Sequence, residues 1–305
     1  MLSYLLRRVL SSAVTIMLVT MIIFVIIRVV GDPTHLMLPP DATQADRDLL
    51  RRTMGLDRPL VVQYLEFLID VAVGDFGLSY RFSQPAMDVV LDRLGHTAIL
   101  TVTALALAAT IGIPLGVLSA VYRDGWIDVL ARTFAVVGQS APPFLFGLLF
   151  VALFSVKLGL LPTSGAGGPL HLVMPAAALG WYSAAGIMRL CRSSMSEVLE
   201  TEYIKMARIK GVPGRLVIFK HALSNACLPV ITFAALQLGV LLGGAVSIEA
   251  VFAWPGLGQL ILKSIDDLDY TVVQAAVTVI AVGFAVINLL VDVVYAWVDP
   301  RIRYD

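Results

Sequence analysis

Charged residues are scarce in this chain of 305 residues. Asp, Glu, Lys and Arg together make up 14% of it, about half of their share in a typical soluble domain. Hydrophobic residues make up 58%, so a soluble fold would lack polar side chains to cover its surface. Most of the apolar area must therefore face lipid or other buried helices, which satisfy their own backbone hydrogen bonds in hydrocarbon. We predict an all-α integral membrane protein.

Residues that carry catalysis, metal binding or redox chemistry are also few. The two cysteines, Cys191 and Cys227, are far apart in the sequence and form neither a disulfide framework nor a paired metal motif. The four histidines are scattered, and the motifs HExxH, GxSxG and GxxxxGK[ST] are absent. We therefore expect no catalytic residue, no metal site, no bound cofactor and no ATP hydrolysis in this chain. The 22 basic and 22 acidic residues balance, which gives no indication of nucleic-acid binding.

Six apolar stretches are long enough to cross a membrane, which takes about 20 helical residues. The first follows Arg7 and Arg8, as in a signal peptide. Its apolar run is longer than the roughly 7–15 residues of a signal-peptide core, and no small-residue cleavage site follows. We expect it to remain as an anchor. The predicted spans cover residues 9–27, 98–121, 134–156, 173–188, 227–247 and 272–298.

Basic residues fall almost entirely on one side of these spans. With a cytoplasmic N-terminus, only Lys157 and Lys263 lie in the short outer connections. Because positive charge is enriched in cytoplasmic loops, we predict that both termini are cytoplasmic. The inner basic residues are Arg7, Arg8, Arg123, Arg132, Arg189, Arg192, Lys205, Arg208, Lys210, Arg215, Lys220, Arg301 and Arg303.

A polar segment of residues 31–96 follows the first span and is expected outside the membrane. It contains six Arg against ten Asp or Glu, and a segment this long need not follow the charge rule. A helix is predicted to begin at Pro59 and to end at Gly74. The predicted domains are residues 1–95, which hold the first span and this segment, and residues 96–305, which hold the other five spans.

A second polar segment, residues 189–226, lies between spans four and five. It is expected in the cytoplasm, with a helix from about Ser196 that Gly211 and Pro213 stop. Residues from Gly214 then lead into span five.

Polar residues inside the predicted spans are few. Such groups must turn toward protein or water, so they either line a translocation path or form hydrogen bonds between helices. Asp292 allows the same two interpretations, a pathway contact or an interfacial carboxylate. Pro142 and Pro143 indicate a broken helix. The candidate path residues are Gln139, Ser140, Ser183, Gln237, Gln274 and Asn288.

Several sequence blocks resemble the permease subunits of binding-protein-dependent ABC importers, in the dipeptide, oligopeptide and nickel class. The inner loop reads EYIKMARIKG over residues 202–211. That family carries a Glu-Ala-Ala signature followed by Gly after three residues; here Ala207 and Gly211 match, and the Glu and the first Ala are absent. Other blocks are GDP at 31–33, GLDRP at 55–59, GDFG at 74–77, EAVFAWPGLG at 249–258 and DPR at 299–301.

The resemblance implies a non-catalytic subunit in the plasma membrane of a prokaryote. It implies a second permease subunit that completes the pore, two ATPase subunits that bind ATP and Mg²⁺, and an external substrate-binding protein. The inner helix would dock on an ATPase. Its implied coupling residues are Tyr203, Lys205, Ala207, Arg208, Lys210 and Gly211.

The external segment and the loop of residues 249–269 would meet the binding protein or close an outer gate. Turn formation and helix capping explain the same residues equally well. The candidate residues are Asp75, Ser79, Glu249 and Trp254.

Di- or oligopeptides are the expected cargo. The same machine could import nickel or a haem-like compound. An ion-coupled secondary transporter would need charged residues in mid-membrane and repeat symmetry, which the sequence lacks. A scaffolding membrane protein is the remaining alternative.

Overall fold

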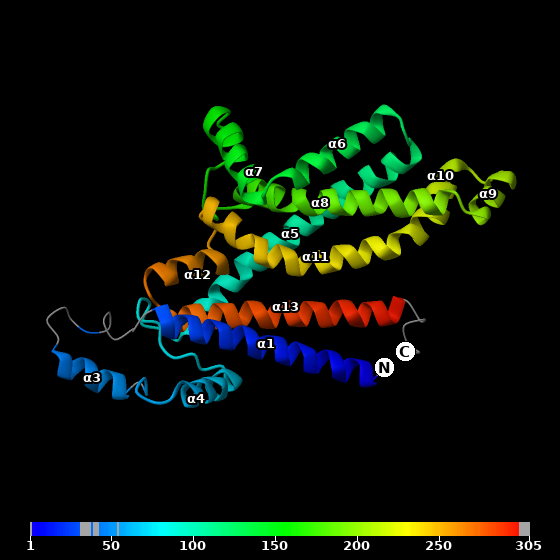
Figure 1. Cartoon of the computed structure of the whole chain (residues 1–305). Coiled ribbons are helices and arrows are strands. Elements are labelled where there is room, and N and C mark those ends of the chain that lie inside the picture. The colour runs from blue at the N-terminus through cyan, green and yellow to red at the C-terminus, as the bar shows by residue number, and fades with distance from the viewer. Residues whose placement is uncertain (1, 31–37, 39–42, 54, 299–305) are drawn as a thin grey trace. The chain divides into compact units, whose positions relative to one another are not determined.

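The computed structural model describes residues 2–30, 38, 43–53 and 55–298. Its elements within this part are helices, apart from one isolated bridge between Leu78 and Pro85. Figure 1 shows their order along the chain. The helices are α1 (Leu2–Val30), α3 (Gln44–Thr53), α4 (Leu60–Val73), α5 (Ala86–Val121), α6 (Trp126–Ser140), α7 (Pro143–Phe150), α8 (Pro169–Leu199), α9 (Glu202–Ile209), α10 (Gly214–Leu216), α11 (Leu223–Val251), α12 (Leu257–Asp266) and α13 (Tyr270–Val298), with π-helical segments at Val151–Lys157 and Val217–Ala222.

The helices form two compact units. The first comprises Met1–His96 with Pro255–Val286, and the second comprises Thr97–Trp254 with Ile287–Asp305. The first thus gathers α12 and the first part of α13 with the N-terminal residues, whereas the predicted division at residue 95 assigned them to the other domain. The reason is packing, because Ala86, Val90, Leu257 and Val272 share one buried core.

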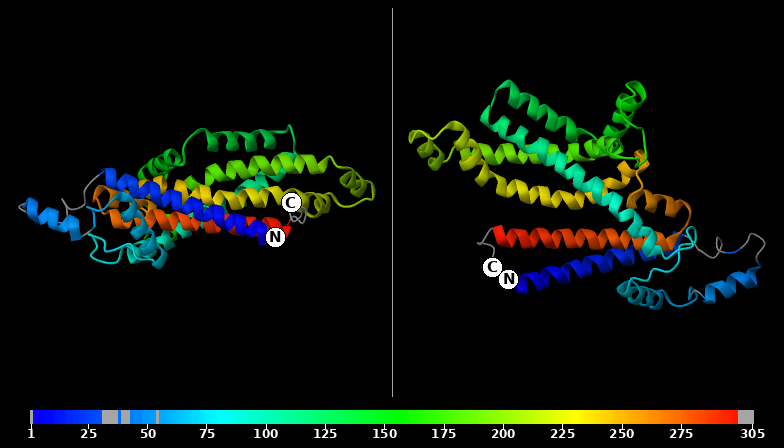
Figure 2. Two further views of the ribbon diagram at one scale, coloured as in Figure 1. Left: turned by 60° about the horizontal axis from the view of Figure 1, so that its bottom comes forward. Right: turned by 180° about the vertical axis from the view of Figure 1, so that it is seen from behind.

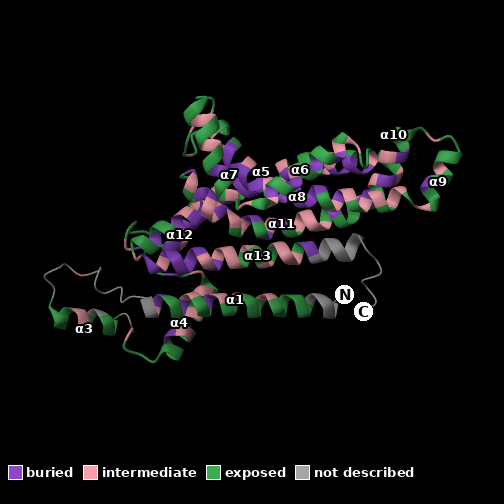
Figure 3. Ribbon diagram, turned by 45° about the horizontal axis from the view of Figure 1, so that its top comes forward, coloured by how far each residue is buried: buried purple, intermediate pink, exposed green. Residues whose placement is uncertain are grey.

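Aromatic residues join α1 to α4 in the first unit. The Phe24 ring lies 5.4 Å from Tyr64 and 5.6 Å from Phe67, and the Tyr64 hydroxyl donates to the Met17 carbonyl at 2.8 Å. Helix α4 has the expected limits, since Pro59 precedes it and Gly74 caps it with a φ of 79°. Most of α1 is exposed (Figure 3).

Helix α8 is the centre of the second unit. It contacts α6, α7 and α11, and 61% of its most apolar stretch is buried. Its approach to α5 depends on small residues, because a Cβ added at Gly180 would lie 2.6 Å from the Ala104 carbonyl oxygen.

The third predicted span is not one straight helix. Helices α6 and α7 meet at an angle of 103°, and Figure 1 shows α7 leaving the axis of α6. Pro142 has no N–H to donate and disfavours helical backbone at the residue before it, and Ala141 is accordingly extended. The described residues therefore contain five candidate spans, or up to six if this bent pair crosses the membrane as one.

Two further boundaries differ from those predicted. The inner helix begins at Glu202 and not near Ser196, because α8 continues to Leu199. Residues 249–269 are not a loop throughout, since Glu249 is in the last turn of α11 and residues 257–266 form α12. The blocks at residues 31–33 and 299–301 and the side chain of Asp292 lie outside the described residues.

Candidate functional site

Helix α9 is short and has one fully buried side chain. Ile204 is fully buried in an apolar cluster with Met195 of α8 and with Val217, Ala222 and Ala226 at the start of the following helix. Glu202 lies in the first turn of α9, where its negative charge interacts favourably with the helix dipole. Figure 2 shows α9 and α10 together at one end of α8 and α11. The core contact thus fixes which face of α9 points outward.

The outward face of α9 combines apolar and basic side chains. Ile209 is 78% exposed, and Met206 and Tyr203 are exposed as well. Lys205 forms an ion pair with Glu202 at 2.7 Å. Arg208 and Lys210 are exposed. An exposed apolar group on a basic helix is typical of a protein interface.

Gly211 ends α9 in the way its sequence predicts. Its φ is 78°, a conformation that glycine adopts without a Cβ penalty. Its N–H donates to the Arg208 carbonyl at 3.0 Å, and the Val212 N–H donates to the Ala207 carbonyl at 3.1 Å. These two bonds form a Schellman motif. Ala207 and Val212 pack on the cluster that holds Ile204, so they contribute to anchoring.

Tyr203 also has a role within the chain. Its hydroxyl accepts a hydrogen bond from Asn225 Nδ2 at 3.0 Å and donates to the His221 carbonyl at 3.4 Å. It therefore ties α9 to the beginning of α11.

A buried ionic cluster, missed from the sequence, joins three helices near this site. Asp128 of α6 is 0% exposed. It accepts two hydrogen bonds from Arg192 of α8, at 2.8 and 3.0 Å, one from the Ser119 hydroxyl of α5 and one from the Asp124 N–H at 3.1 Å. Arg132 lies 3.4 Å away. We call these residues the Asp128 cluster.

Helical periodicity was the available signal for this cluster. Asp128, Ala131, Ala135 and Gly138 are the buried residues of α6, and their spacing of three and four residues defines one helix face. A carboxylate on that face must be paired with a positive charge when it is buried.

Three of the candidate path residues on helices α6, α8 and α11 are at least partly buried: Gln139, Ser183 and Gln237. Gln237 donates to the Ser183 hydroxyl at 3.0 Å, and both are buried. Gln139 lies beside Gly186 of α8. The structure does not group the other three with them: Ser140 is exposed and bonds to the Val137 carbonyl, Gln274 is in the first unit, and Asn288 is partly buried.

The candidate external residues are mostly buried. The Ser79 hydroxyl donates to Asp269, which also accepts from the Thr271 hydroxyl at 2.8 Å. Burial and the nearby Asp269 carboxylate raise the pKa of Tyr80. Asp269 was not predicted, since Ser79 lies in a sequence-distant segment.

Glu249 and Trp254 are buried in the second unit, and Glu249 accepts a hydrogen bond from Thr97 at 2.7 Å. Asp75 is exposed and accepts from the Gly77 N–H at 2.9 Å. The contact of Asp75 is that of a turn, whereas the bond from Thr97 to Glu249 joins α5 to α11.

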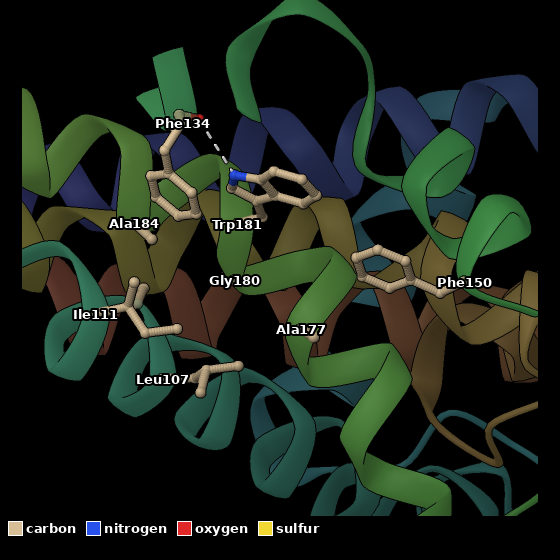
Figure 4. A pocket seen from close by; sticks show the side chains of 9 residues that line it. Leu107, Ile111, Phe134, Phe150, Ala177, Gly180, Trp181 and Ala184 are labelled. Atoms are coloured by element: carbon tan, nitrogen blue, oxygen red, sulfur yellow. Dashed lines mark hydrogen bonds between the residues drawn. The ribbon is translucent and has the colours of Figure 1, made fainter. Parts of the chain in front are cut away.

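An apolar cavity of about 290 Å³ lies among α5, α6, α7 and α8. Figure 4 shows Phe134, Phe150 and Trp181 around it, with the Trp181 N–H donating to the Phe134 carbonyl at 3.3 Å. Small residues, including Ala177, Gly180 and Ala184, form part of its wall. The lining offers no group for acid–base chemistry, and within the described part of the chain no cluster of His, Cys, Asp and Glu could hold a metal.

Known proteins share both sequence and fold with this chain. Residues 112–304 match the family of binding-protein-dependent transport system inner membrane components, and residues 1–101 match the N-terminal family of such membrane components. The glutathione transport system permease protein GsiC of Escherichia coli strain K12 is 41% identical over 305 residues, all of both chains. GsiC of Salmonella typhimurium is 42% identical over the same length.

Solved structures show the fold. A chain of the MetNI methionine ABC transporter, in an inward-facing conformation, has a TM-score of 0.60 and 22% identity over 70% of this chain and 97% of its own length. An amino acid ABC transporter chain has a TM-score of 0.51 and 17% identity, with coverage of 70% and 94%. The chain therefore belongs to the family of inner membrane components of binding-protein-dependent transport systems, as a permease subunit of a bacterial ABC importer.

Proposed function

We propose that this subunit imports peptide-like solutes and that α9 couples it to an ATPase. The observation that carries the coupling assignment is the geometry of α9, with Ile204 fully buried beneath an exposed face of Met206, Arg208 and Ile209. A displacement of α9 is transmitted to the rest of the second unit, because repacking the buried cluster around Ile204 would cost free energy. The glutathione permease relatives support a peptide-like cargo, since glutathione is itself a small peptide.

The assembly that we propose contains a second permease, two ATPase subunits that bind ATP and Mg²⁺, and an external substrate-binding protein. In this arrangement the N- and C-termini and α9 are cytoplasmic, and six spans cross the membrane. The chain itself performs no covalent chemistry. ATP binding shifts the permease only if the ATPase pair favours one of its states over the other.

Two sets of residues are proposed to act in the membrane and at the outer face. Gln139, Ser183 and Gln237 line the path, together with Ser140 and Asn288. Outside, Ser79 and Glu249 hold the segments that meet the binding protein, while Asp75 and Trp254 complete those turns. The hydrogen bonds of Ser79 to Asp269 and of Thr97 to Glu249 support this positioning.

The experiment that tests the coupling assignment reverses two charges, in the variant Arg208→Glu with Lys210→Glu. We expect insertion and expression to be unchanged, because both side chains are exposed, and we expect the ATPase subunits to be lost when the chain is purified in mild detergent. Lys157→Glu, at an exposed basic residue that ends the π-helical segment Val151–Lys157, is the matched control. Retention of the ATPases and normal peptide uptake by the double variant would contradict the assignment.

A further inference from the structure

A second, polar cavity lies in the first unit. Its volume is about 190 Å³, room for about six water molecules at ~30 Å³ each. Arg28 at the end of α1, Asp70 of α4, Tyr80 and Gln274 of α13 are among the residues that line it. None of the transport residues assigned to α6, α8, α9 or α11 contributes to it.

Gln274 gives this cavity an unused hydrogen-bond donor. The side chain is 8% exposed, and its buried amide nitrogen has no hydrogen-bond partner. Leaving such a group unpaired is costly. The other two buried glutamines are satisfied: Gln63 donates to the Arg58 carbonyl at 2.8 Å, and Gln237 donates to Ser183 at 3.0 Å. The Gln274 amide is thus available to an acceptor that enters the cavity.

The charges around the cavity indicate what kind of acceptor fits. The Arg28 guanidinium is fixed by a bond to Gln63 Oε1 at 3.0 Å and lies 4.7 Å from the centre of the Phe24 ring. Arginine and amide N–H groups together favour a carboxylate. The Asp70 carboxylate is exposed at the same cavity, and a carboxylate favours an ammonium group.

We propose that this cavity binds a small free amino acid, with Gln274 and Arg28 at its carboxylate and Asp70 at its ammonium group. Room for about six water molecules at ~30 Å³ each suits a compound as small as alanine. The end of a peptide carries only one of these two charges and does not match the whole site. This proposal rests on the proposed function only in that the cavity lies on the outer side of the membrane.

The test measures binding to the full chain in lipid nanodiscs, without ATP or partner subunits. L-alanine, L-alanyl-L-alanine, L-alaninamide and N-acetyl-L-alanine are titrated and followed by saturation-transfer NMR. We expect saturable binding of L-alanine and about tenfold weaker binding of the other three compounds, since the amide and the acetylated compound each lose one charged contact and the dipeptide is too long to place both charges in the cavity. Binding of the dipeptide without binding of L-alanine would overturn the assignment to a free amino acid.

Three variants connect the signal to the cavity. Gln274→Met keeps the side-chain volume and removes the donor, so binding should weaken about tenfold. Asp70→Asn, at an exposed position that leaves the fold intact, should remove the preference for a free ammonium group. Gln44→Met, on the exposed face of α3, is the matched control and should bind like the wild type.

Absence of saturable binding to the wild type would overturn the proposal, because the cavity would then hold water only. Unchanged binding by Gln274→Met would also overturn it. Neither result bears on the coupling assignment, which is read from ATPase retention and peptide uptake by the complete transporter.

Discussion

Replacement of Asp128 by Asn should destabilise the permease strongly while barely changing its shape. Asp128 is 0% exposed, and Arg192 is 25% exposed. The substitution removes the charge that holds Arg192 at 2.8 and 3.0 Å and leaves that guanidinium partly buried without its partner. Breaking a buried pair from one side costs about 3–5 kcal/mol. Arg192 is a quarter exposed and can regain some hydration, so we expect about 2–3 kcal/mol here.

The expected result is a lower midpoint of thermal unfolding in detergent, by roughly 5–10 °C at 2–4 °C per kcal/mol. Arg192→Met should lower it as well, because the Asp128 carboxylate is fully buried and keeps only Arg132, at 3.4 Å, as a cationic partner. The double variant Asp128→Asn with Arg192→Met should unfold at a higher temperature than the sum of the two effects predicts, since neither charge is then left alone.

Asp92→Asn is the matched control. Asp92 is an exposed residue of α5, outside the Asp128 cluster. We expect its unfolding temperature to stay close to that of the wild type. An unchanged midpoint for Asp128→Asn, or strictly additive effects in the double variant, would refute the argument that the pair acts as one buried unit.

Two further substitutions test helix geometry. Gly211→Ala should reduce ATPase-coupled peptide uptake and lower stability by about 1 kcal/mol, because alanine disfavours a φ of 78°; uptake equal to that of the wild type would contradict a required turn. Gly180→Ala should cost about 1–3 kcal/mol in an unfolding assay, because its Cβ would lie 2.6 Å from the Ala104 carbonyl oxygen, whereas Gly283→Ala, with nothing within 4 Å, should be neutral or slightly stabilising. Equal effects of the two would refute the close contact of α5 and α8.

Features set by local chemistry were predictable from the sequence. Gly74 and Gly211 end their helices in left-handed conformations, and apolar stretches located the membrane helices. Helix α3 had a readable signal that was missed. The Thr43 N–H donates to Asp46 at 2.9 Å and the Thr43 hydroxyl accepts from the Asp46 N–H at 3.3 Å, which is the reciprocal pattern of a capping box. The hydrogen bonds from the Thr43 side chain and N–H also lower the pKa of Asp46.

Features set by partners far along the chain could not be placed from one sequence. Asp269 accepts hydrogen bonds from Ser79 and Thr271. No sequence spacing predicts that residue 79 lies beside residue 269. The break at Pro142 was indicated by two successive prolines, but the 103° angle between α6 and α7 depends on what α7 packs against. The periodicity of α6 showed that Asp128 needed a partner and did not show that Arg192 supplies it.

Helix α8 connects the candidate coupling helix to two buried polar groups of the second unit. Two residues, Glu200 and Thr201, join α8 to α9, and Glu200 forms an ion pair with Arg123 at 2.9 Å. Met195 of α8 lies in the buried cluster that holds Ile204. Two other residues of α8 make the polar contacts: Arg192 donates to Asp128 of α6, and Ser183 accepts a hydrogen bond from Gln237 of α11. Because packed interiors resist continuous deformation, α9 cannot be displaced without moving α8 or repacking this cluster. We therefore expect α8 to carry the displacement of α9 toward the residues proposed to line the path.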